Sequence, residues 1–146
     1  MGEDLALVML RRYFSALDAF DVETALDSFT DDVVYVHPPY GQFYEVDDGD
    51  AVGPGHELAA GRDQLRQLFA ARGEQTTTHH VTGFARTGKV CFNEGVMRDR
   101  GGAPVCTWLA CFEVDEDDRI RCYVPYASVP PLPLVADGAS EQGVSG

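Results

Sequence analysis

Four side chains have the types that proton-transfer chemistry requires. Tyr13 and Asp18 lie in one apolar stretch near the N-terminus, His37 directly precedes two prolines, and His79 is followed by His80. A histidine ordinarily titrates near pH 6.5, so it can accept or donate a proton in neutral solution. A phenol can donate a hydrogen bond to a carbonyl oxygen, and a carboxylate can orient an imidazole. These residues are therefore candidates for general acid–base catalysis.

Each candidate also has a structural interpretation. His79 and His80 are adjacent in a predicted strand and point to opposite faces, so only one of them can enter a pocket. The histidine that does so could instead be a structural residue whose ring is hydrogen-bonded in the core. Asp18 lies about 140° around an ideal helix from Tyr13, and it could be an exposed acid at a helix end. Tyr13 needs a partner for its buried phenol, which could be the main chain or a substrate. His37 could protonate a leaving group or simply end a strand.

Helical periodicity predicts the elements that carry the first two candidates. Residues 4–20 have apolar side chains at helical spacing, and Asp21 can cap a short second helix that extends to the Asp31–Asp32 pair. A third helix is expected at 62–72, between Gly61 and Gly73.

Strands are expected next to and after these helices. Residues 33–37 form the first, and Pro38–Pro39 stop it because proline cannot donate to a ladder. From Thr76 onward the hydrophobic period changes to two, and turn residues separate the segments. This pattern predicts strands at about 77–86, 89–98, 104–114 and 119–128.

Two segments have no clear period. Residues 38–60 are predicted to be a loop, either a lid whose Tyr40, Phe43 and Tyr44 contact a ligand or a disordered insertion. Residues 1–130 are expected to form a single domain, and residues 131–146 a flexible tail.

The element order is that of an α+β fold, with helices on one face of a curved antiparallel sheet. The clearest strand, 104–114, is apolar on both faces: Cys106, Trp108, Ala110, Phe112 and Val114 on one, and Val105, Thr107, Leu109 and Cys111 on the other. One small domain has helices for only one of these faces. The second face therefore predicts a homodimer.

Charge and composition exclude several classes of protein. The net charge of −13 disfavours nucleic-acid binding, and the acid excess is either a high-salt shell or a solubility device. No apolar run could span a membrane and no secretory signal is evident, so a cytoplasmic protein is expected. The chain has neither a CxxC pair, a GxGxxG motif nor a P-loop, so no metal, disulfide or cofactor is expected.

The string RRYFSALDAFDVETALDSFTDDVVYVHPPYG, in this order of elements, resembles the nuclear-transport-factor-2-like (SnoaL-like) superfamily. The stretches GRDQLRQLFAAR, TTHHVTGF and WLACFEVDEDDRIRCYVPYAS extend the resemblance over residues 5–128, with an insertion at 41–60. It implies a cone-shaped fold, with three N-terminal helices packed on a curved antiparallel sheet around one ligand pocket. Because the superfamily includes isomerases, dehydratases, epoxide hydrolases, cyclases and non-catalytic modules, the fold is implied more specifically than the function.

Within the superfamily, the chain is most similar to the scytalone dehydratase and bile-acid 7α-dehydratase type. That type has a helical tyrosine, an aspartate five residues later and a strand histidine, which Tyr13, Asp18 and His79 match. The resemblance implies that His79 is a general base, that Asp18 orients it and that Tyr13 stabilises an enolate. The nearest candidates for that group's further acid are Asn93 and Glu94.

The ketosteroid isomerases are a more distant match. Tyr13 fits their helical tyrosine, but His37 stands where their aspartate base should be and Ala110 where their second acid should be. A true ketosteroid isomerase is therefore not expected.

The leading hypothesis is a cofactor-independent lyase or isomerase that abstracts a proton from a hydrophobic, carbonyl-bearing small molecule such as a steroid or polyketide. Catalytic residues are expected to be Tyr13, Asp18, His79 and His37. Substrate-binding residues are expected to be Tyr35, Asn93, Met97, Trp108 and Phe112. The alternative is a non-catalytic small-molecule-binding or dimerisation module, in which Trp108 and Phe112 would plug the pocket.

Overall fold

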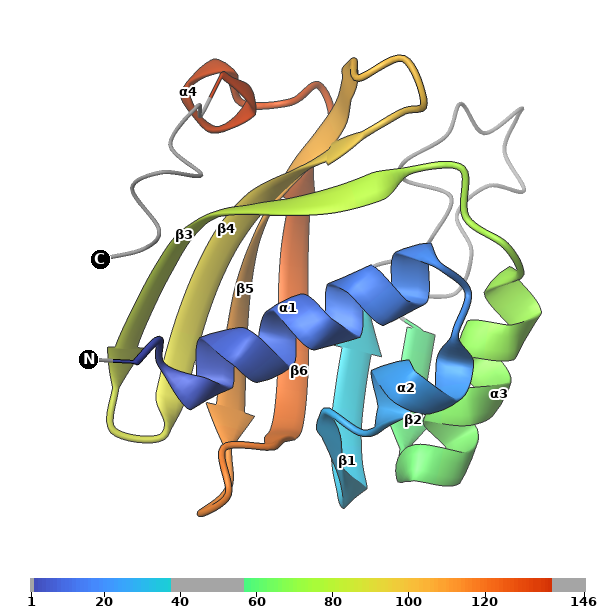
Figure 1. Cartoon of the computed structure of the whole chain (residues 1–146), viewed down its shortest axis with the longest axis vertical. Coiled ribbons are helices and arrows are strands. Elements are labelled where there is room, and N and C mark those ends of the chain that lie inside the picture. Colours follow the sequence, from blue (N-terminus) through green and yellow to red (C-terminus); the bar gives the residue numbers. More distant parts are fainter. Residues whose placement is uncertain (1, 38–56, 138–146) are drawn as a thin grey trace.

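The computed structural model describes residues 2–37 and 57–137. Within them, four helices and six strands follow one another along the chain (Figure 1). The helices are α1 (Leu5–Asp18), α2 (Val22–Leu26), α3 (Arg62–Arg72) and α4 (Pro133–Ala136). The strands are β1 (Phe29–His37), β2 (Glu57–Ala60), β3 (Thr78–Thr87), β4 (Val90–Arg98), β5 (Pro104–Val114) and β6 (Ile120–Ser128).

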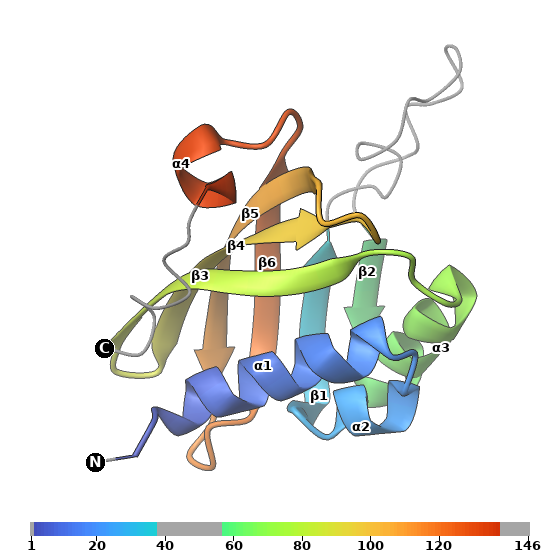
Figure 2. The ribbon, with the colours of Figure 1, turned by 45° about the horizontal axis from the view of Figure 1, so that its top comes forward.

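The strands form one curved sheet in the order β2-β1-β6-β5-β4-β3. Helix α1 lies across its inner face, α2 and α3 lie near β1 and β2, and α4 lies at the far end of β4 and β5 (Figures 1 and 2). This arrangement confirms the predicted α+β class with three N-terminal helices on a curved sheet. The sheet departs from the predicted antiparallel pattern in one described pair, because β1 runs parallel to β6.

Helix α1 owes its position to a cap and an apolar face. The Asp4 carboxylate accepts a hydrogen bond from the Ala6 main-chain N–H at 2.9 Å, which satisfies one of the exposed donors of the first turn. The side chains of the inner face are fully or nearly buried against the sheet: Ala6, Leu7, Leu10, Tyr13, Phe14, Ala16 and Leu17. The helix ends at Asp18, two residues before the predicted end, and Phe20 has a positive φ of 54°.

Three further predicted boundaries in the N-terminal half were wrong. Helix α2 ends at Leu26, and β1 begins at Phe29 rather than at residue 33, because Phe29 pairs with Ile120 of β6. The predicted loop over 38–60 ends in a strand instead, since Glu57–Ala60 pairs antiparallel with β1. Helix α3 has the predicted bounds, with glycines at both caps.

The four predicted meander strands agree with β3, β4, β5 and β6 to within one residue at each end. The inner face of β5 is buried, as expected. On its outer face Thr107 is covered, where its hydroxyl accepts the Leu132 N–H at 3.0 Å, whereas Leu109 is 54% exposed. The outer face of β5 is therefore only partly covered within the single chain.

Two further predictions concern segments at the margins of the described residues. The proposed lid lies mostly in residues 38–56, which are outside them, as are residues 138–146 of the expected tail. Residues 133–136 of that tail form α4, with Ala136 buried. In the described residues, no helix is long and apolar enough to cross a membrane.

Candidate active site

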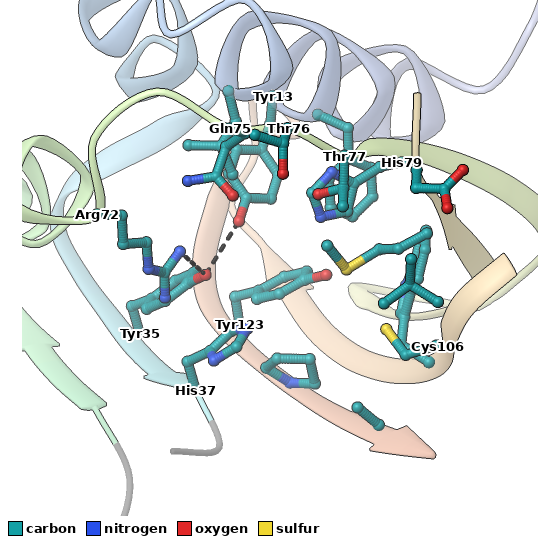
Figure 3. A pocket seen from close by; sticks show the side chains of 18 residues that line it. Tyr13, Tyr35, His37, Arg72, Gln75, Thr76, Thr77, His79, Cys106 and Tyr123 are labelled. Atoms are coloured by element: carbon teal, nitrogen blue, oxygen red, sulfur yellow. Dashed lines mark hydrogen bonds between the residues drawn. The ribbon is translucent and has the colours of Figure 1, made fainter. Parts of the chain in front are cut away.

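A cavity of about 240 Å³ lies between α1 and the inner face of the sheet. Figure 3 shows side chains from α1, α3, the segment after α3 and the strands converging on it. Most of its exposed lining surface is apolar, but polar groups also line it, a combination typical of small-molecule sites. The lining residues are Tyr13, Phe14, Leu17, Tyr35, His37, Arg72, Gln75, Thr76, Thr77, His79, Met97, Asp99, Val105, Cys106, Trp108, Tyr123, Pro125 and Ala127.

Asp18 holds His79 at two points. Its Oδ2 accepts the His79 main-chain N–H at 2.8 Å, and its Oδ1 lies 2.6 Å from the ring Nδ1. Because the ionised carboxylate can only accept, Nδ1 must carry the proton of that hydrogen bond. In the neutral ring, Nε2 is then the basic nitrogen, so the dyad gives His79 the tautomer of a general base. Both side chains are largely buried, at 13% and 14% exposure.

Aromatic rings fix the plane of the His79 imidazole. Phe14 stacks on it with ring centroids 4.7 Å apart and an interplanar angle of 9°, and Trp108 approaches at 5.5 Å in an edge-on geometry. The neighbouring His80 points away from the cavity and bonds the Thr78 hydroxyl at 2.8 Å. The alternation expected of adjacent strand residues is confirmed.

Tyr13 lies in a second polar cluster at the cavity. Its hydroxyl is 3.0 Å from that of Tyr35, and the Arg72 guanidinium donates to the Tyr35 hydroxyl at 3.4 Å (Figure 3). Burial raises the pKa of Tyr13 well above its usual value, and the neighbouring Tyr35 and Tyr123 raise it further, while Arg72 lowers it. Tyr13 is therefore a neutral phenol with a proton to donate throughout the physiological range.

The other predicted residues divide into two groups. Tyr35, His37, Met97 and Trp108 all line the cavity, and the ring of His37 stacks on that of Tyr35 with centroids 6.0 Å apart. Asn93 and Phe112 are buried but are not part of the lining.

The residues outside the lining have supporting positions instead. Asn93 accepts the Trp108 Nε1–H at 2.7 Å and so fixes the orientation of the indole, while Phe112 packs against Phe84 and Tyr123. Neither Asn93 nor Glu94 brings a group into the cavity. Within residues 2–37 and 57–137, the carboxylate of the lining is that of Asp99, just beyond the end of β4, and its Oδ1 accepts the Gly101 and Ala103 N–H groups.

Several lining residues were missed by the sequence analysis. Arg72 is the last residue of the predicted third helix, and Tyr123 lies in the predicted last strand, on the same face as buried Pro125. Strand alternation could have indicated Tyr123. No local pattern could have indicated Arg72, because its placement depends on how α3 meets β1.

Comparisons with known proteins place the chain in a family. The sequence matches the SnoaL-like domain family over residues 10–123. The chain therefore belongs to the SnoaL-like domain family. No curated protein sequence matches the chain.

Solved structures of similar fold come from several bacteria. An NTF2-like protein of unknown function from Burkholderia xenovorans LB400 is 17% identical, with a TM-score of 0.60 over 84% of this chain and 82% of that one. A candidate polyketide cyclase from Sinorhizobium meliloti is 18% identical, with a TM-score of 0.56 over 81% and 93%. A candidate ketosteroid isomerase from Kribbella flavida DSM 17836 is 14% identical, with a TM-score of 0.58 over 84% and 77%. At these identities the likeness concerns the fold alone.

Proposed function

We propose that the protein is a cofactor-independent lyase or isomerase that abstracts a proton next to the carbonyl group of a hydrophobic small molecule. The observation that carries the proposal is the Asp18–His79 dyad on the wall of an apolar cavity that also contains the Tyr13 phenol. A base held in one tautomer and a protonated donor at the same cavity are the two groups that enolisation needs.

The reaction begins when His79 Nε2 removes a proton from the carbon α to the carbonyl. The electron pair of that C–H bond moves into the new C=C bond, and the carbonyl oxygen gains the negative charge, which the Tyr13–Tyr35 hydroxyls stabilise. Asp18 stabilises the imidazolium that forms, as the carboxylate does in other His–carboxylate pairs.

The fate of the enolate depends on the substrate. With a hydroxyl on the β-carbon, the C–O bond breaks, the electron pair leaves with oxygen, and a proton from His37 or from the His79 imidazolium completes a water molecule. With a β,γ-unsaturated ketone, the imidazolium instead returns its proton to the γ-carbon of the dienolate, and the double bond moves into conjugation with the carbonyl group. The first outcome is that of a dehydratase, and the second that of an isomerase.

The cavity also suggests the kind of substrate. Phe14, Met97 and Trp108 supply apolar walls, which favours a hydrophobic compound such as a steroid or polyketide. The polyketide cyclase and ketosteroid isomerase names of two structural neighbours favour the same classes. The volume of about 240 Å³ favours compact compounds with one or two rings, such as small polyketides, over the four-ring steroids.

Proton exchange tests this proposal without knowledge of the natural substrate. A panel of one- and two-ring ketones, such as tetralones and cyclohexenones, is incubated with the protein in D₂O, and loss of the α-proton signal is followed by NMR. The wild type should accelerate exchange for at least one ketone. His79→Ala should reduce that rate by about 10²–10⁴-fold with little change in melting temperature. A variant that loses stability but no exchange activity would assign His79 to the core and refute the proposal.

The alternative is a non-catalytic module that binds a small molecule. One observation favours it: Tyr13 already has a protein partner in Tyr35, as a structural tyrosine would. Against it, among the described residues Phe112 lies outside the cavity and Trp108 forms part of the cavity wall. Tight binding of panel ketones without any exchange would favour the module.

A further inference from the structure

Arg72 brings a buried positive charge to the cavity. Its side chain is only 6% exposed, and its Nη2 donates to the Glu57 carboxylate at 2.7 Å. The guanidinium also lies over the rings of Tyr35 and Phe69, 5.7 and 5.6 Å from their centroids. These contacts hold the cation in one place, on the side of the cavity where the Tyr13 and Tyr35 hydroxyls meet (Figure 3).

A guanidinium has five N–H donors and no acceptor, which sets the direction of the hydrogen bonds. The Tyr35 oxygen must accept from Arg72, so the Tyr35 proton is not used toward Arg72. One phenolic proton is shared between the Tyr35 and Tyr13 oxygens, whichever of them donates. The described part of the chain gives neither hydroxyl another acceptor. One phenolic O–H is therefore left to donate into the cavity in either arrangement.

We propose that Arg72, acting through Tyr35, makes the Tyr13–Tyr35 pair an anion-selective oxygen site for an enolate or phenolate oxygen, with Glu57 moderating the charge. Arg72 is in this respect a positioning residue. The inference deepens the proposed function, since it names the species that the site prefers. Such a site stabilises the enolate more than the ketone, which is the difference that accelerates a reaction.

The surroundings strengthen the effect of the charge. Interactions between charges are larger where water is excluded, and Tyr13 and Tyr35 are 2% and 1% exposed. Burial raises the pKa of Tyr13, and the positive charge of Arg72 lowers it. The field of Arg72 therefore reaches the Tyr13 oxygen. Glu57 offsets part of that field, because its carboxylate accepts from the same guanidinium.

The test uses 4-nitrophenol, a planar phenol whose ionised and neutral forms differ in absorbance. The pH at which the bound probe ionises measures the preference of the site for the anion. All proteins carry His79→Ala, which removes the proposed base from beside the probe. The other ionisable groups that line the cavity, such as His37, Asp99 and Cys106, are the same throughout the set.

Two substitutions should act in opposite directions. Arg72→Met should raise the ionisation pH of the bound probe by about one pH unit or more, which is a tenfold or greater loss of phenolate preference. Glu57→Gln should lower it, because the amide oxygen can still accept from Arg72 while the neutralising charge is gone. Arg72→Lys should fall between the wild type and Arg72→Met, since lysine keeps the charge but not the planar fork.

Arg72→Met and Glu57→Gln should shift the ionisation pH of the probe in opposite directions. If Arg72→Met does not fold, Glu57→Gln and Arg72→Lys decide the result alone. An unchanged ionisation pH in Glu57→Gln, or an upward shift, overturns the inference, as does a phenolate preference that survives Arg72→Met. Because no turnover is measured, failure of the anion site is distinguished from failure of the proposed reaction, which the ketone exchange assay reports.

Discussion

Trp108 lies directly against the main chain of Gly95, its cross-strand partner in the β4–β5 ladder. A β-carbon at position 95 would overlap the indole ring and also the main-chain carbonyl oxygen of His80 on β3. The bare α-carbon thus lets the indole pack closely against β4, where Asn93 accepts its Nε1–H. This contact sets the depth of the cavity wall beside His79.

Gly95→Ala should displace the indole toward the cavity and strain the β3–β4 pairing. We expect a loss of about 1–3 kcal/mol in the free energy of unfolding, the usual cost of overpacking. The bound probe or ketone should also lose affinity, because Trp108 is a wall of the site. Urea unfolding and ligand titration measure the two effects.

Gly83→Ala is the matched control on the adjacent strand. A β-carbon there would lie 2.8 Å from Glu94 Cγ, which belongs to a flexible side chain that can move. Its loss of stability should be smaller than that of Gly95→Ala, and affinity for the ligand should be unchanged. Equal losses in the two variants would show that Trp108 does not depend on the glycine.

Asp18→Asn should reduce proton exchange while the fold persists. The amide can replace one of the two acceptor atoms that hold His79, but its NH₂ group then faces either the ring or the main-chain N–H. The ring is no longer held in the tautomer with a basic Nε2, and a loss between about 10- and 10⁴-fold is expected, the upper figure being that of a serine-protease triad. NMR of the ring nitrogens should show a mixed tautomer population. Wild-type exchange with a mixed population would contradict the assigned role.

The protein should lose stability in alkaline solution through its buried phenols. Burial raises the pKa of both Tyr13 and Tyr123 well above 10, so the folded state holds their protons more tightly than the unfolded chain. Their contribution to the free energy of unfolding is complete below about pH 10, where the phenols of the unfolded chain titrate. It is lost as the pH rises toward the pKa of the folded state. Burial raises the pKa of Cys91 and Cys106 to about 11, which acts in the same direction.

Urea midpoints measured from pH 8 to 11.5 test this. Tyr13→Phe and Tyr123→Phe should each make the decline above pH 10 shallower than in the wild type. A decline of the same slope in all three proteins would exclude the two buried phenols as its cause.

We propose that the outer face of the sheet is a homodimer interface. Phe92, Leu109 and Tyr126 lie on neighbouring strands of this face and are 40%, 54% and 62% exposed. Light scattering should therefore give about twice the 15.9 kDa of one chain. Because each chain has a net charge of −13, added salt should strengthen association by screening repulsion.

Leu109→Glu should convert the dimer to a monomer, since it adds a carboxylate to the centre of the apolar face. Val8→Glu is the control, because Val8 is an exposed apolar residue on α1, away from this face. A wild-type mass of one chain in dilute neutral buffer, or an intact dimer in Leu109→Glu, would exclude this interface.

The sequence predicted elements well where local pattern determines them. Helix α3 has glycines at both caps, and the meander strands alternate between turns, so both could be located from neighbouring residues. Strand β2 was missed because Leu58 is 69% exposed and the four residues are extended only through pairing with β1. The start of β1 was missed because Asp31 and Asp32 are exposed acids that do not resemble strand residues. This part of the strand forms through its pairing with β6.

The same distinction applies to the candidate site. Spacing and family resemblance indicated Asp18 and His79, and the structure brings them into contact across 61 residues of chain. Arg72 was not predicted, because a helix-end arginine is ordinarily solvated, and only the packing of α3 beside β1 places it against Tyr35. Its partner Glu57 lies on the strand that was itself missed.

The parallel pairing of β1 with β6 has a consequence for how the molecule is made. Tyr35 and Tyr123 stack face to face across this pair, so the floor of the cavity joins the first strand of the chain to the last. A nascent chain on the ribosome can form α1 early, but it cannot enclose the cavity until β6 has emerged. Folding that depends on such distant contacts is slow compared with local helix formation. Until then Arg72 and the tyrosines of the cavity are exposed to water. The ligand can be recognised only after β6 has completed the sheet.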